Sequence, residues 1–201
     1  MTPQQVARRV TELVVRRQWL WPLLRGRLRD RFDELAPTWE TRIGPHHLGA
    51  MSLALDGLRE PRRILDLGTG TGVAARDLAE RYPQAEIVGV DLSPRMIAEA
   101  EKLLPDELGS RVAFRVADAA RLPFADASFD LVVLANMIPF WGELARVTAP
   151  GGHVVFSFSL GEETPIHVPS ETLRRELGRR GFAEFAEFSA PPATALRATK
   201  G

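Results

Sequence analysis

The sequence predicts an α/β fold, a doubly wound and mostly parallel seven-stranded sheet with one antiparallel strand and a helical N-terminal extension. From residue 59 onward, short apolar runs alternate with amphipathic helical patterns, which is typical of parallel sheets. A glycine-rich turn follows the first of these runs directly. The last two runs are joined through Pro191-Pro192, which predicts a strand–turn–strand pair and therefore one antiparallel strand.

The individual elements follow from the same patterns. Apolar and β-branched runs predict strands over residues 63–67, 85–90, 112–116, 129–134, 153–158, 182–188 and 194–199. Helical spacing predicts helices near 72–81 and over 94–104, and a third from an N-cap at Ser170 to Gly181. Pro150-Gly151-Gly152 is predicted to be the turn before the fifth strand. We expect two units, a helical N-terminal cap over 1–58 and a ligand-binding domain over 59–201.

Composition excludes several classes of protein. The chain has 201 residues, of which 45% are hydrophobic and 26% charged, as in ordinary globular domains. It has no cysteine, so it has no disulfide framework and no thiolate nucleophile, and we expect no metal site. The formal net charge is zero, which argues against a nucleic-acid partner. No apolar stretch is long enough for stable membrane insertion, and we expect a cytoplasmic protein.

The first 31 residues carry most of the positive charge. They contain eight arginines against Glu12 and Asp30. Apolar residues at helical spacing predict one or two basic amphipathic helices, with Trp19 and Trp21 close to Pro22. Three interpretations remain open for this segment: simple packing on the main domain, a lid over an apolar substrate, or a contact with a membrane surface.

The strongest local signal is the stretch from Ile64 to Gly72, a strand followed by alternating glycines. Glycines at such a turn let a ligand approach the backbone closely, at the N-terminus of the next helix. Residues 70–75 formally match the G-x-G-x-x-A pattern of dinucleotide binders, with Asp91 about 20 residues further on. Asp66 argues against a dinucleotide, because a carboxylate there repels a pyrophosphate and favours a cationic ligand.

Five motifs in order resemble those of class I methyltransferases that use S-adenosylmethionine (SAM), a family with a Rossmann-like fold that includes many small-molecule enzymes. The resemblance covers about residues 60–189. It rests on Asp66-x-Gly68-x-Gly70-x-Gly72, on residues 88–97 with their Ser-Pro helix start, on Ala117-Asp118 with Leu122-Pro-Phe124, on residues 128–133, and on residues 146–152.

The resemblance implies a role for each matching residue. Asp66 would lie near the amino group of SAM, and Asp91 would accept hydrogen bonds from the ribose hydroxyls. The remaining cofactor-binding residues would be Gly68, Thr69 and Gly70 at the methionine portion, Leu92, Met96, Asp118 and Ala119 at the adenine, and Asn136 and Met137 near the transferred methyl group. The product would be S-adenosylhomocysteine (SAH).

A general base is needed only if the acceptor must lose a proton before it attacks. His167 is a weak candidate for this catalytic role, and His46 and His47 are two others. Residues 32–39 resemble the segment before the domain in small-molecule methyltransferases, including quinone C-methyltransferases. Trp39 and Arg42 are therefore candidate contacts for the substrate or the cofactor.

The stretch 136–142 departs from the family, which often has a histidine pair after the fourth strand. An apolar wall that includes Trp141 stands there instead, which predicts an apolar or aromatic small-molecule substrate. Two alternatives are a catalytically silent SAM-binding regulatory module and, less favoured, an NAD(P)-dependent oxidoreductase. We expect no nucleic-acid partner, and a homodimer is the candidate assembly.

Overall fold

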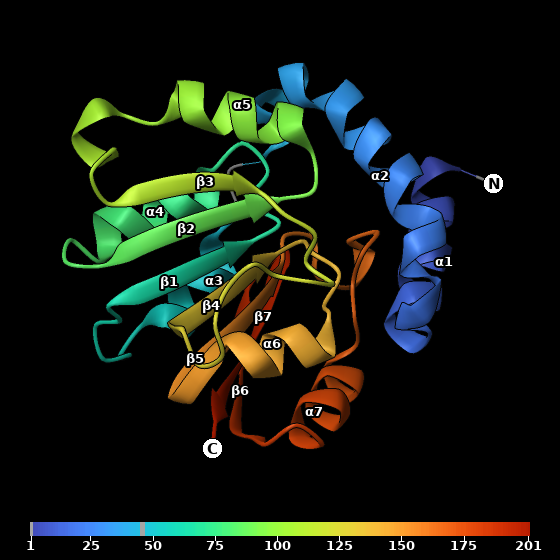
Figure 1. Ribbon diagram of the computed structural model, residues 1–201. Coiled ribbons are helices and arrows are strands. Elements are labelled where there is room, and N and C mark those ends of the chain that lie inside the picture. Colours follow the sequence, from blue (N-terminus) through green and yellow to red (C-terminus); the bar gives the residue numbers. More distant parts are fainter. Residues whose placement is uncertain (1, 45–46) are drawn as a thin grey trace.

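The computed structural model describes residues 2–44 and 47–201. Its sheet has seven strands in the order β3-β2-β1-β4-β5-β7-β6, as Figure 1 shows. β7 runs antiparallel to both of its neighbours, and the other strands share one direction. The strands are β1 (Arg63–Leu67), β2 (Glu86–Asp91), β3 (Val112–Val116), β4 (Phe129–Ala135), β5 (Thr148–Phe158), β6 (Phe182–Ala190) and β7 (Ala193–Lys200). The predicted doubly wound sheet with one antiparallel strand is confirmed.

Helices and short 3-10 turns surround the sheet. The α-helices are α1 (Pro3–Arg16), α2 (Trp21–Leu35), α3 (Gly49–Leu55), α4 (Val73–Arg81), α5 (Pro94–Leu103), α6 (Trp141–Val147) and α7 (Ser170–Gly178). The 3-10 turns are η1 (Gln18–Leu20), η2 (Ala36–Thr38), η3 (Glu40–Arg42), η4 (Asp106–Leu108) and η5 (Gly161–Glu163).

Two apolar clusters form the core, one on each face of the sheet. Ile64, Leu131 and Val155 point to the face covered by α3 and α4. Their sequence neighbours Leu65 and Val132 point to the opposite face, which α6, α7 and the N-terminal helices cover. Each central strand is therefore buried on both sides, which explains why the sequence there is continuously apolar.

The N-terminal helices lie along one side of the molecule in Figure 1, where α2 rises from α1 toward α5. Val14 of α1 and Trp21 of α2 are buried in the core cluster. Helix α3 packs against β5, β6 and β7, so it contacts the sheet directly. The division of the chain at residue 58 stays a prediction.

Three local predictions need correction. Pro150–Gly152 belongs to an irregular part of β5, where the pairing with β4 shifts register between Phe129 and Leu131. A Cβ at Gly152 would lie 2.8 Å from the carbonyl oxygen of Ala149, so the chain bends tightly there without leaving the sheet. Pro169, and not Ser170, is the N-cap of α7, and this helix ends at Gly178.

Candidate cofactor site

The glycine turn between β1 and α4 requires glycine at three positions. Gly68, Gly70 and Gly72 have φ angles of 77°, 55° and 82°, in the left-handed region. A Cβ at Gly68 would lie 2.7 Å from Sδ of Met137, which packs over the turn from the loop after β4. A side chain at these positions would therefore strain the turn.

Three N–H groups at the start of this turn are already used inside the protein. Those of Gly68 and Thr69 donate to the carbonyl oxygen of Val90 at 2.8 and 2.9 Å. The N–H of Gly70 donates to Oδ2 of Asp91 at 3.0 Å. A phosphate group needs such donors, whereas an ammonium group needs acceptors. The turn is therefore better suited to a cationic group than to a pyrophosphate.

Asp66 lies at the end of β1 directly below this turn and is 1% exposed. Its Oδ2 accepts a hydrogen bond from the Thr69 hydroxyl at 2.5 Å, and Oδ1 has no partner among the described residues. Burial raises the pKa of Asp66 to about 7; the bond from Thr69 lowers it, and the nearby Asp91 raises it further. An unpartnered buried carboxylate oxygen is an acceptor for a ligand donor.

Asp91 ends the neighbouring strand β2 and contacts two loops. Besides Gly70, it accepts from the N–H of Ser93 through Oδ1 at 2.8 Å. Burial raises its pKa to about 6, against hydrogen bonds from the backbone of Ser93 and Gly70. Leu92 is partly exposed beside it, whereas Met96 is 1% exposed on the inner side of α5.

The carboxylate of Asp118, after β3, already has several donors. Its Oδ1 accepts from the indole N–H of Trp21 at 2.8 Å and from the N–H of Ala120 at 2.9 Å. Its Oδ2 accepts from Arg25 at 2.8 Å. Ala119 is buried next to it. An adenine amine at this position would also donate to the carboxylate, so it would share the Asp118 oxygens with these donors or replace one of them.

Residues 21–40 form what we call the N-terminal strap, which contacts the loops after β1, β2 and β3. At its first end lies the contact with Asp118. In the middle, Asp33 accepts from the hydroxyl of Ser93 at 2.5 Å and from the N–H of Arg95 at 3.2 Å. At its last end, Glu40 accepts from the Thr71 hydroxyl. The strap therefore closes the carboxyl edge of the sheet beside the predicted cofactor site.

Trp39 belongs to this strap and lies over the glycine turn. Its Nε1 is 3.2 Å from the position that a Cβ of Gly70 would take, and its ring packs edge-on against Phe32 with centroids 5.7 Å apart. Arg42 is exposed, and its nearest polar partner is the hydroxyl of Thr38 at 3.4 Å. The structure thus brings Trp39, but not the guanidinium of Arg42, into contact with the turn.

The loop after β4 begins with Asn136, whose φ of 53° is left-handed. Its amide exchanges two hydrogen bonds of 2.9 Å with Ser159, one to the hydroxyl and one from the N–H. Nδ1 of His47 lies 3.4 Å from the same amide nitrogen. The amide therefore ties the end of β4 to the chain that follows β5.

Trp141 differs from the expectation. Only 2% of it is exposed, and its indole N–H donates to the carbonyl oxygen of Val15 at 3.2 Å. It lies in the core between α6 and the N-terminal helices, so it forms no open wall for a substrate. Ile138, Phe140 and Trp141 are apolar because all three side chains are buried in the core of the protein.

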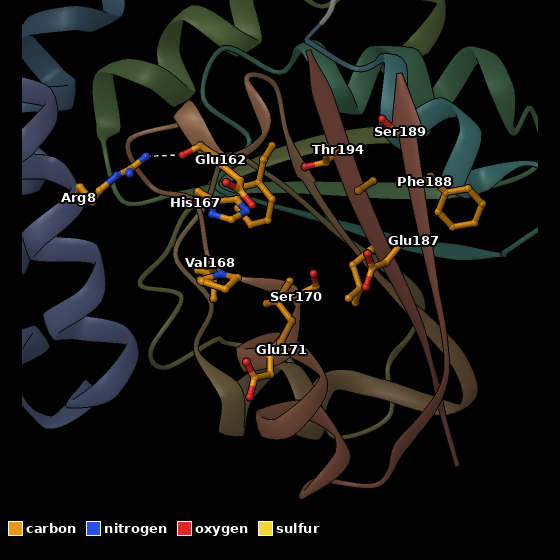
Figure 2. Close-up of a pocket in the computed structure, with 15 residues that line it drawn as sticks. Arg8, Glu162, His167, Val168, Ser170, Glu171, Glu187, Phe188, Ser189 and Thr194 are labelled. Carbon is orange, nitrogen blue, oxygen red and sulfur yellow. Dashed lines mark hydrogen bonds between the residues drawn. The ribbon is translucent and has the colours of Figure 1, made fainter. Parts of the chain in front are cut away.

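His167 lies at a separate cavity of about 640 Å³ near η5, α7 and the β6–β7 pair, shown in Figure 2. Its ring packs edge-on against Phe158 with centroids 4.8 Å apart, and partial burial lowers its pKa. Arg8 of α1 reaches the cavity rim and donates to the carbonyl oxygen of Glu162. His46 lies outside the described residues.

Sequence reasoning missed the anchors of the strap, namely Trp21, Arg25, Asp33 and Glu40. Spacing along the chain gives no signal for them, because their partners lie 31 to 97 positions away. Only the resemblance over residues 32–39 indicated that this region belongs near the site.

Comparison with known proteins agrees with this geometry. Residues 64–152, from β1 to the irregular part of β5, match a family profile described as a methyltransferase domain. Over this segment the chain is similar to methyltransferase domains. A demethylmenaquinone methyltransferase of Thermus thermophilus is 47% identical over 139 residues, which make up 62% of this chain and 62% of that protein. A malonyl-[acyl-carrier protein] O-methyltransferase of Halorhodospira halophila is 43% identical over 112 residues, or 52% of this chain and 37% of that one.

The fold also has structural neighbours. A SAM-dependent methyltransferase of Aquifex aeolicus superposes with a TM-score of 0.65 at 19% identity, covering 81% of this chain and 96% of that one. This similarity supports the fold. The chain thus spans less than two thirds of the length of the two curated relatives, while it matches nearly the whole length of the structural neighbour.

Proposed function

We propose that this chain transfers the methyl group of SAM to a small, apolar or aromatic molecule. The observation that carries the proposal is Oδ1 of buried Asp66, which has no partner among the described residues, below a turn in which the N–H groups of Gly68, Thr69 and Gly70 are already bonded. This arrangement offers an acceptor to an ammonium group, whereas three N–H groups that could bind a pyrophosphate are already used. It favours SAM over NAD(P).

The residues that would hold SAM lie along one edge of the sheet. Asp66 would accept from the amino group, and the close approach at Gly68, Thr69 and Gly70 would admit the methionine portion. Asp91 would accept from the ribose hydroxyls through lone pairs that its two backbone donors leave free. The further contacts would be Leu92, Met96, Asp118 and Ala119 at the adenine, and Asn136 and Met137 toward the methyl group.

Bound SAM would supply a methyl group on a sulfonium that is already electrophilic. The protein would then need to align the acceptor and exclude water. Met137 and Trp39 lie on the glycine turn from two different loops, so they are placed to enclose the reacting end. Enclosure raises the effective concentration of the acceptor without any covalent step by the protein.

The relatives and the cavity beside His167 bear on the class of acceptor. The relatives are named for different acceptors, a demethylmenaquinone and a malonyl-[acyl-carrier protein]. The cavity beside His167 is lined by apolar side chains such as Phe158, Val168 and Leu173 together with polar and charged ones such as Glu162 and Glu171, which suits a molecule with both an apolar and a polar part. His167 stays a proposed base for acceptors that must lose a proton, and Trp39 and Arg42 stay proposed contacts. We also propose a cytoplasmic location and the division into 1–58 and 59–201.

Calorimetric titration of the full chain with SAH, NAD and NADP tests the cofactor. We expect one-to-one binding of SAH alone. Methyl transfer from labelled SAM to demethylated naphthoquinones then separates an active enzyme from a silent SAM-binding module. Binding of NAD in place of SAH would refute the proposal, and SAH binding without transfer to any apolar acceptor would favour the regulatory module.

A further inference from the structure

The outward side of η1 and α2 carries large apolar side chains that nothing in the described chain covers. Trp19 is 72% exposed and Leu23 is 75% exposed. They are four positions apart in a nearly continuous helical stretch, as are Leu23 and Arg27, so all three lie on one side of it. Gln18 fixes η1 to the body of the protein by donating to the carbonyl oxygen of Pro139 at 2.8 Å.

The outward side of α1 continues this pattern. Val6 and Leu13 are 45% and 39% exposed and are seven positions apart, on one side of the helix. Arg9 and Arg16 are also seven positions apart and lie next to that stripe. We call the exposed residues of these two helical stretches the basic outer face: Val6, Arg9, Leu13, Arg16, Arg17, Trp19, Leu23 and Arg27.

The arginines of the basic outer face differ from their neighbours in their partners. Arg25 pairs with Asp118, Arg29 with Asp30 and Arg31 with Glu34. By contrast, no carboxylate of the described residues forms an ion pair with Arg9, Arg16, Arg17 or Arg27. Among the described residues the face therefore presents four arginines without an ion pair around exposed apolar side chains, and Glu12 is an exposed carboxylate close to Arg9 and Arg16 on α1.

The inner side of the same helices packs against the body of the protein. Val14 is completely buried, and Trp21 is 4% exposed while its indole bonds to Asp118. The helices are therefore held in place by their inner side. The exposure of Trp19 and Leu23 is a property of the docked helices and not of a detached segment.

We propose that the basic outer face binds the surface of an anionic lipid bilayer. Arginines would contact lipid phosphates, and Trp19 and Leu23 would enter the boundary between headgroups and acyl chains, as in interfacial amphipathic helices. This inference goes beyond the proposed methyl transfer and does not depend on it. No described helix is long and apolar enough to cross a membrane, so the contact is with the surface only.

Two other partners fit the face less well. A nucleic acid would use the arginines and could stack on Trp19, but it has no use for the aliphatic side chains of Leu13 and Leu23. A second copy of the chain would bring two sets of unpaired arginines together, and like charges repel. The combination of charge and aliphatic exposure favours a lipid surface.

The test is co-sedimentation of the full chain with vesicles of phosphatidylcholine, alone or mixed with phosphatidylglycerol. We expect binding only to the anionic vesicles, with a blue shift of tryptophan emission and quenching by brominated acyl chains. Trp19→Ser/Leu23→Ser should weaken binding about tenfold or more and remove the quenching. Arg16→Glu/Arg27→Glu should abolish the preference for phosphatidylglycerol.

Matched controls distinguish the effect of the basic outer face from the effect of the same change in charge or hydrophobicity elsewhere on the protein. Arg59→Glu/Arg62→Glu makes the same charge change just before β1, and Leu103→Ser removes an exposed apolar side chain at the end of α5. Both should bind vesicles as the parent chain does, and circular dichroism checks that every variant is folded. Equal loss in the controls would overturn the proposal. So would RNA binding without vesicle binding, or a dimer that Trp19→Ser dissociates.

Discussion

The indole N–H of Trp21 and Oδ1 of Asp118 are 2.8 Å apart, although 97 positions separate them in the chain. This bond fixes the first end of the N-terminal strap to the loop where the resemblance places the adenine. The same carboxylate also accepts from Arg25, a second residue of the strap. Asp118 is therefore both an anchor of the strap and the proposed acceptor for the adenine amine.

Asp118→Ala and Arg25→Ala separate these two roles. Asp118→Ala leaves the Trp21 N–H without an acceptor, which should lower the free energy of unfolding by about 1–3 kcal/mol, and it should weaken SAH binding. Arg25→Ala removes a half-exposed ion pair, so we expect at most about 1 kcal/mol and no loss of SAH affinity. For both variants, calorimetry measures the affinity for SAH and urea unfolding measures the free energy of unfolding. Unchanged SAH affinity in Asp118→Ala would restrict Asp118 to anchoring the strap.

Gly68→Ala tests the closeness of the glycine turn. The left-handed φ alone costs about 1–2 kcal/mol, and the new Cβ would meet Met137, so both stability and SAH affinity should fall. Gly142→Ala is the control, because no atom lies within 4 Å of its Cβ position in α6. There we expect a gain of up to about 1 kcal/mol and unchanged binding. Equal SAH affinity in the two variants would contradict a ligand at the turn.

The raised pKa of Asp66, about 7, predicts a pH-dependent affinity. In the proposed complex the ammonium group of SAH would bind the ionised carboxylate, so affinity should fall by up to about tenfold per pH unit as the pH drops below 7. In the free protein the sign is opposite: protonated Asp66 stabilises the fold at low pH, and this contribution is lost as the pH rises through about 7. Titrations and thermal melts from pH 5.5 to 8 test both. Asp66→Asn should remove the part of both dependences that is centred near pH 7 and leave the part due to Asp91 near pH 6, and a pH-independent affinity in the parent chain would contradict the assignment.

Asp91→Asn should weaken SAH binding by about 10- to 100-fold, since bonds to a charged acceptor contribute about 1.5–3 kcal/mol. An amide also turns an NH₂ group toward the N–H of Gly70 or Ser93, which destabilises the turn. Asp106→Asn, an exposed acid in η4, is the control and should change neither affinity nor melting temperature. Differential scanning fluorimetry with and without SAH distinguishes lost binding from lost stability.

Local sequence patterns predicted most of the sheet. Strands 63–67 and 112–116 begin and end as predicted, because their apolar runs are bounded by polar or turn residues. The short helices α3 and α6 were missed, since seven residues carry too little periodicity to distinguish a helix from a loop. Trp141 was misjudged for a related reason: an apolar residue after a strand can face a ligand or a core, and only the packing of α6 decides.

The residues of the site also fall into those that the sequence could indicate and those that it could not. The residues of the glycine turn and the ends of β1 and β2 stand in local motifs, so the sequence could indicate them. Asp33 and Glu40 act through partners that only the folded chain brings near, Ser93 and Thr71. No spacing rule reaches across such distances.

The strap's three anchors are nested. Glu40 pairs with residue 71, Asp33 with residue 93 and Trp21 with residue 118, so each step toward the N-terminus meets a later part of the chain. The innermost contact closes the shortest loop and is the least costly in chain entropy, and the outermost closes the longest. During synthesis the strap should therefore dock in the order Glu40, Asp33, Trp21, because the partner of each residue leaves the ribosome in that order. In the finished protein it should peel open in the reverse order, uncovering the loop of Asp118 first while Glu40 still holds.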